Sequence, residues 1–529
     1  MVTKTAAYDY VIVGAGSAGC VLASRLTEDP DTSVLLLEAG EPDEKRKINI
    51  PAGFPDLFES EIDWEYHTEP QSEMNGRELY WPRGKTMGGS SSINAMIYIR
   101  GHPSDYDRWE SLGNEGWGYD DVLPYFKRGE QFEPGDGDYH GTDGPLNVTT
   151  ARSPRSVSRT FIEAALEVGY PRNADFNGPK QEGVGMYHLT QKRGKRHSAA
   201  TAYLKPALDR ENLTVETGAL ATQLRFDGDR ATGVKFERDE RALYAEATRE
   251  VLVSGGAVNS PQLLLLSGVG DADQLTEHGI EPQIDLPGVG KNLQDHLFSF
   301  VVYESQQDGT LDDAGRLRDL AAYFLLKRGP LTSNIAESGG FVRTEHADEA
   351  PDLQFHFAPA YFMNHGFDNP EDESGISIGA TQLRPESRGQ VSLCSADPHD
   401  DPRIDPNYLD ADADLETLIA GVRKAREIFR AEPFDDVRGE ERWPGEDVET
   451  DAEIEAHVRE TAQTVYHPVG TCKMGDGDLA VVDDRLRVHG IEGLRIVDAS
   501  VIPTLVGGNT NAPTMMIAEK AAEMIREDR

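Results

Sequence analysis

The chain has 529 residues, more than a single hydrophobic core usually organises, so at least two domains are expected. It carries 52 Lys and Arg against 93 Asp and Glu, a formal net charge of -41. The acidic residues are dispersed and no basic stripe is present to neutralise phosphates. This pattern excludes a nucleic-acid partner and favours a protein of haloarchaeal type, adapted to a high-salt cytosol, over an ordinary acidic enzyme.

Cysteine usage and the N-terminus bear on the location of the protein. Cys20, Cys394 and Cys472 lie far apart and lack the spacing of metal ligands, which predicts reduced thiols and no metal site. The chain enters a strand without an apolar signal segment, and no apolar run reaches the ~18 residues of a membrane-spanning helix. A cytoplasmic location is therefore expected.

The first forty residues predict a strand, a glycine turn, a helix and a second strand. Residues 11–13 are continuously apolar, and Gly14, Gly16 and Gly19 follow with the G-x-G-x-x-G spacing. The first glycine permits a tight turn, the second lets a pyrophosphate approach the backbone, and the third lets helix and strand pack closely. Glu38 ends the second strand where an acid binds a ribose hydroxyl, which disfavours NADP. This unit predicts an ADP-containing dinucleotide, either NAD or FAD.

The middle of the chain supplies a polar loop and a return to the first sheet. Residues 81–101 place Gly-Gly-Ser-Ser-Ser between apolar segments, where backbone N–H groups and hydroxyls could bind an anionic or carbonyl-rich ligand. Residues 212–253 predict strands with hairpin turns at 227–229 and 238–241. A buried strand at 250–257 and a helix from about Ser260 repeat the strand–glycine–helix pattern, so the nucleotide-binding domain is expected to be discontinuous.

A different pattern between about 300 and 460 predicts a second domain. Residues 353–362, 375–385 and 389–395 are strand-like, and residues 414–431 form an amphipathic helix. The last stretch predicts a strand at 495–500, a loop and a helix that return to the first domain. The expected class is α/β plus α+β, with a discontinuous Rossmann-type domain and an antiparallel-sheet substrate-binding domain. The first domain is expected over 1–160, 191–300 and 461–529, and the second over 161–190 and 301–460.

Five long segments give the chain a family resemblance, namely residues 84–94, 256–270, 383–409, 466–475 and 497–522. With them the chain resembles the glucose–methanol–choline (GMC) oxidoreductases over nearly its whole length, and choline dehydrogenase-like members in particular. The resemblance implies bound FAD rather than NAD. It also implies an enzyme that oxidises the CH–OH group of an alcohol.

The resemblance indicates which residues contact the cofactor. Some members carry a histidine in the loop at 88–94 that bonds covalently to the flavin, and Ile93 stands at that position here, so dissociable FAD is expected. The residues expected to bind FAD come from the glycine turn, the second strand, the polar loop and the C-terminal segments: Gly14, Gly16, Ser17, Ala18, Gly19, Glu38, Ala39, Met87, Gly88, Gly89, Ser90, Asn94, Ala95, Met96, Ile97, Gly256, Asp498, Ala499, Asn509 and Asn511.

His467 is the expected catalytic base. Oxidation of an alcohol by hydride transfer requires the hydroxyl proton to leave as well, and histidine accepts a proton near neutral pH. The family places a base at this position, and Asn511 is the expected partner that holds the substrate oxygen. Tyr466 is expected to line the substrate pocket and Glu337 to meet a cationic head group. Three other histidines are expected to be structural or surface residues: His197, His296 and His356.

The leading hypothesis is therefore hydride transfer from an alcohol, choline foremost, to the flavin. The electron acceptor stays open among a quinone, a carrier and oxygen, as do the oligomeric state and a peripheral membrane contact. Another alcohol or a sugar is an alternative substrate, and a redox-silent FAD-containing lyase is an alternative activity.

Overall fold

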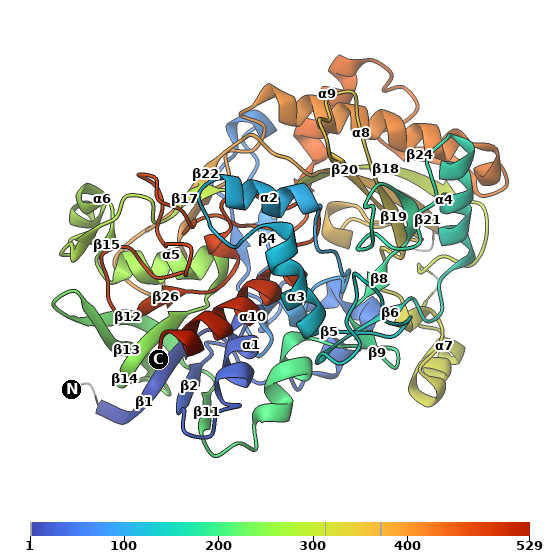
Figure 1. The fold of residues 1–529 in the computed structure, drawn as a ribbon. Coiled ribbons are helices and arrows are strands. Elements are labelled where there is room, and N and C mark those ends of the chain that lie inside the picture. The colour runs from blue at the N-terminus through green and yellow to red at the C-terminus, as the bar shows by residue number, and fades with distance from the viewer. Residues whose placement is uncertain (1–2, 313, 371–372) are drawn as a thin grey trace.

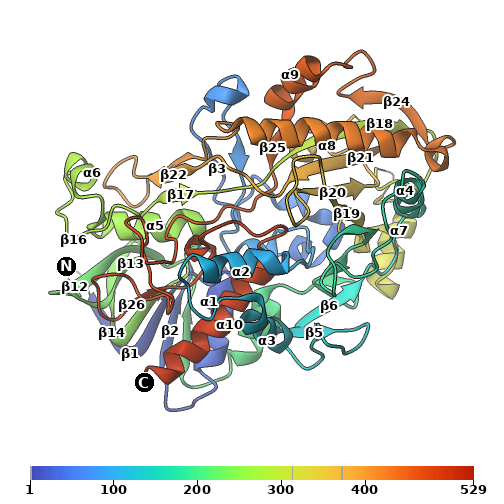
Figure 2. The same ribbon diagram turned by 45° about the horizontal axis from the view of Figure 1, so that its top comes forward.

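Two seven-stranded sheets organise the protein in a computed structural model that describes residues 3–312, 314–370 and 373–529 (Figure 1). The described chain begins in the first sheet and ends beside it, and the second sheet lies on the far side of the molecule (Figures 1 and 2). The α/β plus α+β class expected from the sequence is confirmed.

The first sheet contains the strand that leads into the glycine turn. Its order is β11-β2-β1-β14-β13-β12, with β26 beside β14. The pairs among β11, β2, β1, β14 and β26 are parallel, and β12 and β13 form an antiparallel hairpin pair with β14. The strands are β1 (Thr3–Val13), β2 (Val34–Leu37), β11 (Leu213–Glu216), β12 (Leu220–Asp227), β13 (Arg230–Arg238), β14 (Arg241–Val253) and β26 (Leu494–Ile496).

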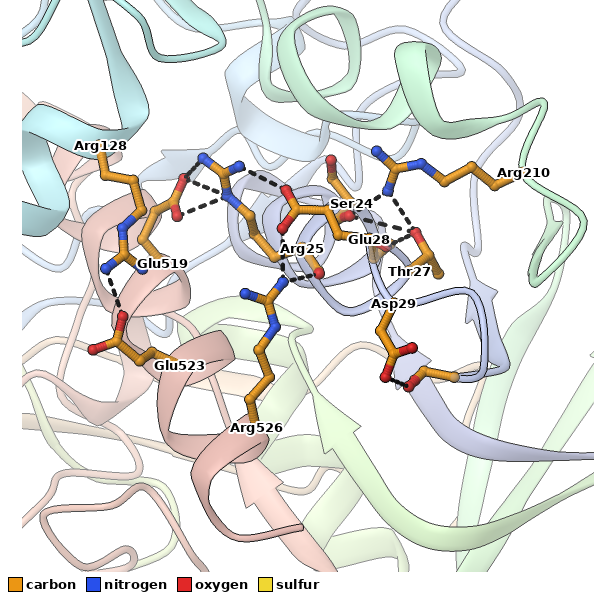
Figure 3. A network of polar contacts seen from close by, with 12 residues as sticks. Ser24, Arg25, Thr27, Glu28, Asp29, Arg128, Arg210, Glu519, Glu523 and Arg526 are labelled. Carbon is orange, nitrogen blue, oxygen red and sulfur yellow. Dashed lines mark hydrogen bonds and ion pairs between the residues drawn. The ribbon is translucent and has the colours of Figure 1, made fainter.

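Three helices follow strands of this sheet, two of them directly and the third after a loop. They are α1 (Ser17–Leu26), α5 (Gly256–Leu266) and α10 (Asn511–Glu527). Ion pairs join α1 to α10 (Figure 3): Arg25 pairs with Glu519 at 2.8 Å, and Arg526 pairs with Glu28 at 2.8 Å. Glu519 is buried, so removing its partner would leave a buried charge uncompensated, at a cost of roughly 3–5 kcal/mol. The network fixes α10, and the segment before it, against the glycine turn.

The second sheet is antiparallel, as expected. Its order is β24-β18-β21-β20-β19-β7, with β25 beside β18. The long helix α8 (Asp412–Arg430) lies along it (Figure 2). The strands are β7 (Gly183–Met186), β18 (Leu297–Ser305), β19 (Ser338–Val342), β20 (Leu353–Ala358), β21 (Gly375–Gln382), β24 (Arg438–Trp443) and β25 (Gln463–Thr464), and the further helices are α4 (Ser156–Glu167) and α9 (Asp451–Thr461).

Smaller elements connect the two sheets. The remaining helices are α2 (Pro103–Ser111), α3 (Tyr119–Gly129), α6 (Ala272–Glu277) and α7 (Leu317–Ala321). The remaining strands form small sheets: β3 (Tyr66–His67) with β4 (Tyr80–Trp81), β5 (Glu130–Phe132) with β6 (Leu146–Thr150) and β8 (His188–Leu189), β9 (Gln191–Lys192) with β10 (Lys195–Arg196), β15 (Val269–Gly270) with β16 (Ile284–Asp285), and β17 (Lys291–Leu293) with β22 (Gly389–Ser392) and β23 (Arg403–Asp405).

Two details differ from the sequence analysis. The helix expected from Ser260 begins at Gly256, because the Asp498 carboxylate accepts hydrogen bonds from the Gly256 N–H (2.8 Å) and the Ser260 hydroxyl (2.6 Å). The strand predicted at 389–395 belongs to a three-stranded sheet rather than the large antiparallel one. The domain boundaries remain a prediction, and β18 crosses the one expected at residue 300. In the described part of the chain, no helix combines the length and hydropathy needed to cross a membrane.

Candidate active site

Three helix N-termini meet at one cavity. The cavity has a volume of ≈ 440 Å³ and is lined by Ser17, Gly256 and Asn511, the first residues of α1, α5 and α10. In all three helices, which the structure describes in full, the N-cap residue makes no side-chain hydrogen bond to the first turn. At α5 the Asp498 carboxylate already accepts the Gly256 N–H, whereas at α1 the first-turn N–H groups and the positive end of the helix dipole favour an anionic ligand, as a pyrophosphate is.

The predicted glycines bring backbone segments into direct contact. A Cβ on Gly14, whose φ is +97°, would lie 2.5 Å from the Ser254 carbonyl oxygen. A Cβ on Gly19 would lie 1.9 Å from the Gly14 carbonyl oxygen, and one on Gly89 would lie 2.7 Å from the Gly16 Cα. Side chains at these positions would push the polar loop away from the glycine turn, so glycine is required by packing.

Glu38 lies at the end of β2, as predicted. Its carboxylate accepts hydrogen bonds from the Ala15 N–H (2.8 Å) and the Gly40 N–H (2.9 Å), and it lines the cavity. Burial raises the pKa of the Glu38 carboxyl to about 7, against the lowering effect of these backbone bonds. The Glu38 carboxylate oxygens have further lone pairs, which can accept hydrogen bonds from the two hydroxyls of a ribose.

The lining fits FAD. The Ser254 hydroxyl is buried without a hydrogen-bond partner in the described protein and faces this cavity, which indicates a ligand that pairs with it. Seventeen of the predicted residues line the cavity, namely Gly14, Gly16, Ser17, Ala18, Glu38, Ala39, Gly89, Ser90, Asn94, Ala95, Met96, Ile97, Gly256, Asp498, Ala499, Asn509 and Asn511.

Three predicted cofactor residues lie outside the lining: Gly19, Met87 and Gly88. Gly19 packs on the carbonyl of Gly14, and Met87 belongs to the hydrophobic core. The Gly88 N–H donates to the Ala15 carbonyl at 2.7 Å. All three support the shape of the turn and loop and do not line the cavity. The sequence prediction included them because local spacing does not distinguish packing from ligand contact.

His467 is buried at the cavity wall. It follows β25, whose Thr464 hydroxyl donates to the Asp295 carboxylate at 2.5 Å, and the same carboxylate accepts the His467 N–H at 2.7 Å. Asp295 and His296 immediately precede β18, the partner strand of β25. The strand pairing therefore sets the position of the histidine backbone, and the ring lines the cavity.

A chain of hydrogen bonds fixes the proton positions on the two adjacent histidines. The Leu383 carbonyl, 3.1 Å away, can only accept, so His296 carries its proton on Nε2 and has a bare Nδ1. That Nδ1 lies 3.0 Å from His467 Nδ1, which must then be the donor. The remaining nitrogen, His467 Nε2, is left unprotonated, so its lone pair can accept a hydrogen bond or a proton.

Burial keeps both rings neutral. It lowers the pKa of His296 to about 3 and that of His467 well below its ordinary value, and the neighbouring His296, His356 and Arg83 lower the latter further. Since a neutral imidazole has one bare nitrogen, the assigned tautomer holds at neutral pH. His296, expected to be a structural or surface residue, is buried outside the cavity lining and orients His467.

Asn509, rather than Asn511, is the residue beside His467. The Asn509 Nδ2 donates to His467 Nε2 at 3.1 Å, and its Oδ1 accepts from Gln354 Nε2 at 3.2 Å, which fixes the orientation of the amide. Asn511 Oδ1 instead accepts from the Ser17 hydroxyl at 2.7 Å. Both residues line the cavity, and the role predicted for Asn511, to hold the substrate oxygen, stays a prediction.

Three residues with a strained backbone conformation lie at the same cavity. Met96, Ile335 and Tyr466 line it, with φ values of 59°, 70° and 68° in the left-handed region. Each such conformation costs roughly 1–3 kcal/mol and persists only where neighbours enforce it. The Arg83 guanidinium donates to the Tyr466 carbonyl at 2.6 Å, and the Tyr466 backbone N–H donates to the Thr464 hydroxyl at 2.7 Å. The strain places Tyr466 in the lining, where it was predicted, and orients His467 after it.

The wall beside His467 is apolar and aromatic. Its rings form one hydrophobic cluster and are Phe54, Phe58, Phe298, Phe300, Phe362 and Tyr466. Among the described residues, the acids that line the cavity are Glu38, Asp400, Asp401 and Asp498, none of which belongs to this cluster. The charged side chains near Tyr466 are those of Arg83, which lines the cavity, and of Asp295 and Asp63, which do not.

Glu337 was expected to meet a cationic head group, but it lies outside the cavity lining. It is fully buried outside the cavity lining, where it accepts from the Ser158 hydroxyl at 2.5 Å and the Arg155 N–H at 2.7 Å. Burial raises the pKa of its carboxyl. The residue ties α4 to the start of β19 and offers no carboxylate to a cationic head group.

The fold and site define a dinucleotide-dependent oxidoreductase, and comparisons with known proteins narrow the class. The N-terminal GMC oxidoreductase profile matches residues 8–298 and the C-terminal profile matches residues 385–518. The alcohol dehydrogenase [acceptor] of Pseudomonas putida is 48% identical over 527 residues, covering 98% of this chain and 95% of that protein. The mitochondrial choline dehydrogenase of Mus musculus is 47% identical over 533 residues, covering 98% and 89%. Pyridoxine 4-oxidase from Mesorbium loti has a TM-score of 0.90 at 34% identity, covering 98% and 99%.

The chain belongs to the GMC oxidoreductase family. It is an FAD-dependent oxidoreductase that acts on alcohols.

Proposed function

We propose that this enzyme oxidises neutral alcohols with an apolar carbon chain, with His467 as the base and non-covalent FAD as the hydride acceptor. The observation that supports this most directly is the bare Nε2 of His467, which faces the cavity between Asn509 and an aromatic wall. The resemblance to relatives named for alcohol and choline supports the reaction class.

The residues divide the work of the reaction. FAD, when bound, accepts the hydride from the alcohol carbon. Nε2 of His467 accepts the hydroxyl proton, a contribution of about 10²–10⁴-fold in rate. Asn509 Nδ2–H and that nitrogen hydrogen-bond each other at 3.1 Å, so an alcohol hydroxyl that displaces this bond can accept from Asn509 while it donates to His467. His296 acts as a positioning residue, because its bare Nδ1 accepts the Nδ1–H of His467 and so keeps Nε2 of His467 unprotonated.

The wall favours a neutral substrate. Its phenylalanine rings would remove an alkyl or aryl chain from water, at about 25 cal/mol per Å² of apolar surface. Asp295 and Asp63 offset the charge of the nearby Arg83, and the described acids of the lining lie outside this cluster, so the wall presents no carboxylate to a cation. Choline is the second candidate, because aromatic rings also attract quaternary ammonium groups.

Non-covalent FAD and the electron acceptor complete the proposal. Ile93 lines the cavity and is almost fully buried, and its hydrocarbon side chain offers no nucleophile to the flavin. The acceptor is a quinone, a carrier or oxygen. A test with an oxygen electrode separates these, since only use of oxygen produces hydrogen peroxide in stoichiometric amounts.

The experiment is anaerobic reduction of the bound FAD. The oxidised flavin band is followed after mixing with an alkanol, benzyl alcohol, choline or a sugar. The proposal expects rapid bleaching by the alkanol and benzyl alcohol, and slower bleaching by choline. Preferential bleaching by choline would favour the second candidate. Bleaching by dithionite but by none of the alcohols would favour a redox-silent lyase.

We further propose that the protein is adapted to a high-salt cytosol. Its net charge of -41 supports this, because self-repulsion of a dispersed acidic surface destabilises the compact state and is screened by salt. The thermal midpoint should rise steeply with KCl up to molar concentration. A midpoint that is independent of KCl would contradict the proposal.

A further inference from the structure

One short segment concentrates the exposed apolar side chains of the protein. Within the residues that the structure describes, nine large hydrophobic side chains are exposed, and five of them lie between residues 317 and 326. These five, called the apolar face below, are Leu317 (86% exposed), Leu320 (37%), Phe324 (55%), Leu325 (80%) and Leu326 (66%). Scattered exposed leucines need no explanation, but a contiguous set marks an interaction surface.

The segment is held firmly on its inner side. It consists of α7 and the helical turn Ala322–Leu326 that continues it. Tyr323 is buried, and its hydroxyl donates to the Asn49 carbonyl at 2.7 Å. Asp319 is also buried. The apolar side chains thus point outward from an anchored helix, which lies at the periphery of the molecule in both views (Figures 1 and 2).

Basic residues surround the apolar face, although the whole chain is strongly acidic. Gly194, at the tip of the β9–β10 hairpin, packs on the segment, since a Cβ there would lie 2.8 Å from the Lys327 carbonyl oxygen and 3.2 Å from Arg152 Cδ. The surrounding cations, called the basic rim, are Arg152, Lys192, Arg193, Lys195, Arg318, Lys327 and Arg328. Asp319 offsets part of this charge, because Arg318 lies 3.6 Å from its carboxylate. A local excess of positive charge remains, in a chain whose net charge is -41.

We infer that the apolar face and the basic rim dock on the surface of an anionic lipid bilayer. An amphipathic helix with leucine and phenylalanine on one side lies in the interfacial layer, and flanking lysines and arginines contact the anionic headgroups. The complementary charge favours a bilayer over a symmetric pair of this chain, in which the two basic rims would face each other. Five side chains are also too few for a stable dimer, which buries about 800 Å² per partner.

The position of the face suits an apolar alcohol. The turn Pro330–Thr332 follows the segment directly, and Ile335 beyond it lines the cavity. The Tyr323 hydroxyl donates to the carbonyl of Asn49, and Phe54 and Phe58, a few residues after Asn49 in the chain, line the cavity. Docking would hold this side of the active site beside the lipid, where apolar alcohols and quinones are concentrated. The docking surface itself stands on geometry and charge and does not depend on the proposed function.

The test is sedimentation of the holoenzyme with lipid vesicles. Vesicles of phosphatidylglycerol and phosphatidylcholine in equal parts are compared with vesicles of phosphatidylcholine alone, in a KCl series in which the flavin spectrum stays unchanged. The wild type should bind the anionic vesicles, and binding should weaken as KCl screens the basic rim. The L317S/L325S/L326S variant should lose about tenfold or more in partition coefficient, because three interfacial leucines are removed.

Two control variants separate docking from general effects. The L112S/L208S/L479S variant removes three exposed leucines elsewhere, which are 50%, 44% and 42% exposed, and should bind as the wild type does. The K192Q/R193Q/K195Q variant should lose binding to anionic vesicles and become insensitive to KCl. The inference is overturned if the wild type stays in the supernatant, or if both leucine variants bind equally. It is also overturned if sedimentation velocity shows a dimer that the L317S/L325S/L326S variant lacks, since a second copy would then cover the face.

Discussion

The amide Nδ2 of Asn509 lies 3.1 Å from Nε2 of His467, whereas Asn511, two residues further on, hydrogen-bonds Ser17. Both asparagines line the cavity, and the first is the one hydrogen-bonded to the histidine. We propose different roles for the two, one beside the reacting hydroxyl and one at the contact of α10 with α1.

Asn509→Ala should slow anaerobic reduction of the FAD by roughly 10–100-fold, because the alcohol oxygen loses its positioning donor. Asn511→Ala is the matched control and should reduce the rate much less, while weakening retention of FAD. Stopped-flow absorbance measures the first effect, and flavin content after gel filtration measures the second. Equal rate losses in both variants would contradict the assignment.

His296 should act on the rate through His467. His296→Leu removes the acceptor of the His467 Nδ1–H and leaves a buried donor unpaired, which costs roughly 1–3 kcal/mol. The rate of flavin reduction should fall about tenfold or more. His296→Asn keeps an acceptor oxygen at this position and should restore most of the rate. If His296→Leu and His296→Asn lose the same activity at equal stability, the proposal that His296 fixes the tautomer of His467 is contradicted.

FAD should leave the protein on denaturation. Ile93 offers the flavin only hydrocarbon, so precipitation with acid should release yellow flavin into the supernatant with the mass of unmodified FAD. A yellow pellet after washing would show a covalent bond to another residue.

A buried histidine away from the site should make stability depend on pH. The Asn147 N–H donates to His197 Nδ1 at 3.1 Å, and burial, with a smaller effect of Lys192, lowers the pKa of His197 to about 4. Its folded pKa lies below the unfolded value of ~6.5, so its contribution is complete above pH 6.5 and is lost as the pH falls toward 4.

The size of this effect can be measured by comparison with His197→Gln, which keeps an acceptor but does not titrate. Between pH 6.5 and 5 the stability advantage of the wild type in urea unfolding should shrink by ~2 kcal/mol, at ~1.4 kcal/mol per pH unit. An advantage that is constant over this range would show that His197 is protonated in the folded protein.

Local patterns predicted most of the framework. The glycine turn, the strands at 11–13 and 353–362 and the long helix after residue 412 depend on neighbours in sequence, and the structure contains them. Glu38 was also predicted, because the length of one helix fixes its distance from the turn.

Contacts between distant segments were less accessible. His296 and His467 are 171 residues apart and meet only because β25 pairs with β18. The choice between Asn509 and Asn511 depends on where α10 begins and how it packs on α1, which spacing in the loop does not reveal. The apolar face on α7 carries leucines that resemble those of a buried helix in sequence, and only the fold leaves them exposed.

The most direct test of the account is the rate at which an alkanol or benzyl alcohol reduces the bound FAD in His467→Ala, measured anaerobically against the wild type. The account predicts a loss of about 10²–10⁴-fold while the FAD remains bound and its spectrum unchanged, because the hydroxyl proton has lost its acceptor. A variant that retains FAD and reduces it at nearly the wild-type rate would contradict the assignment of His467 as the base.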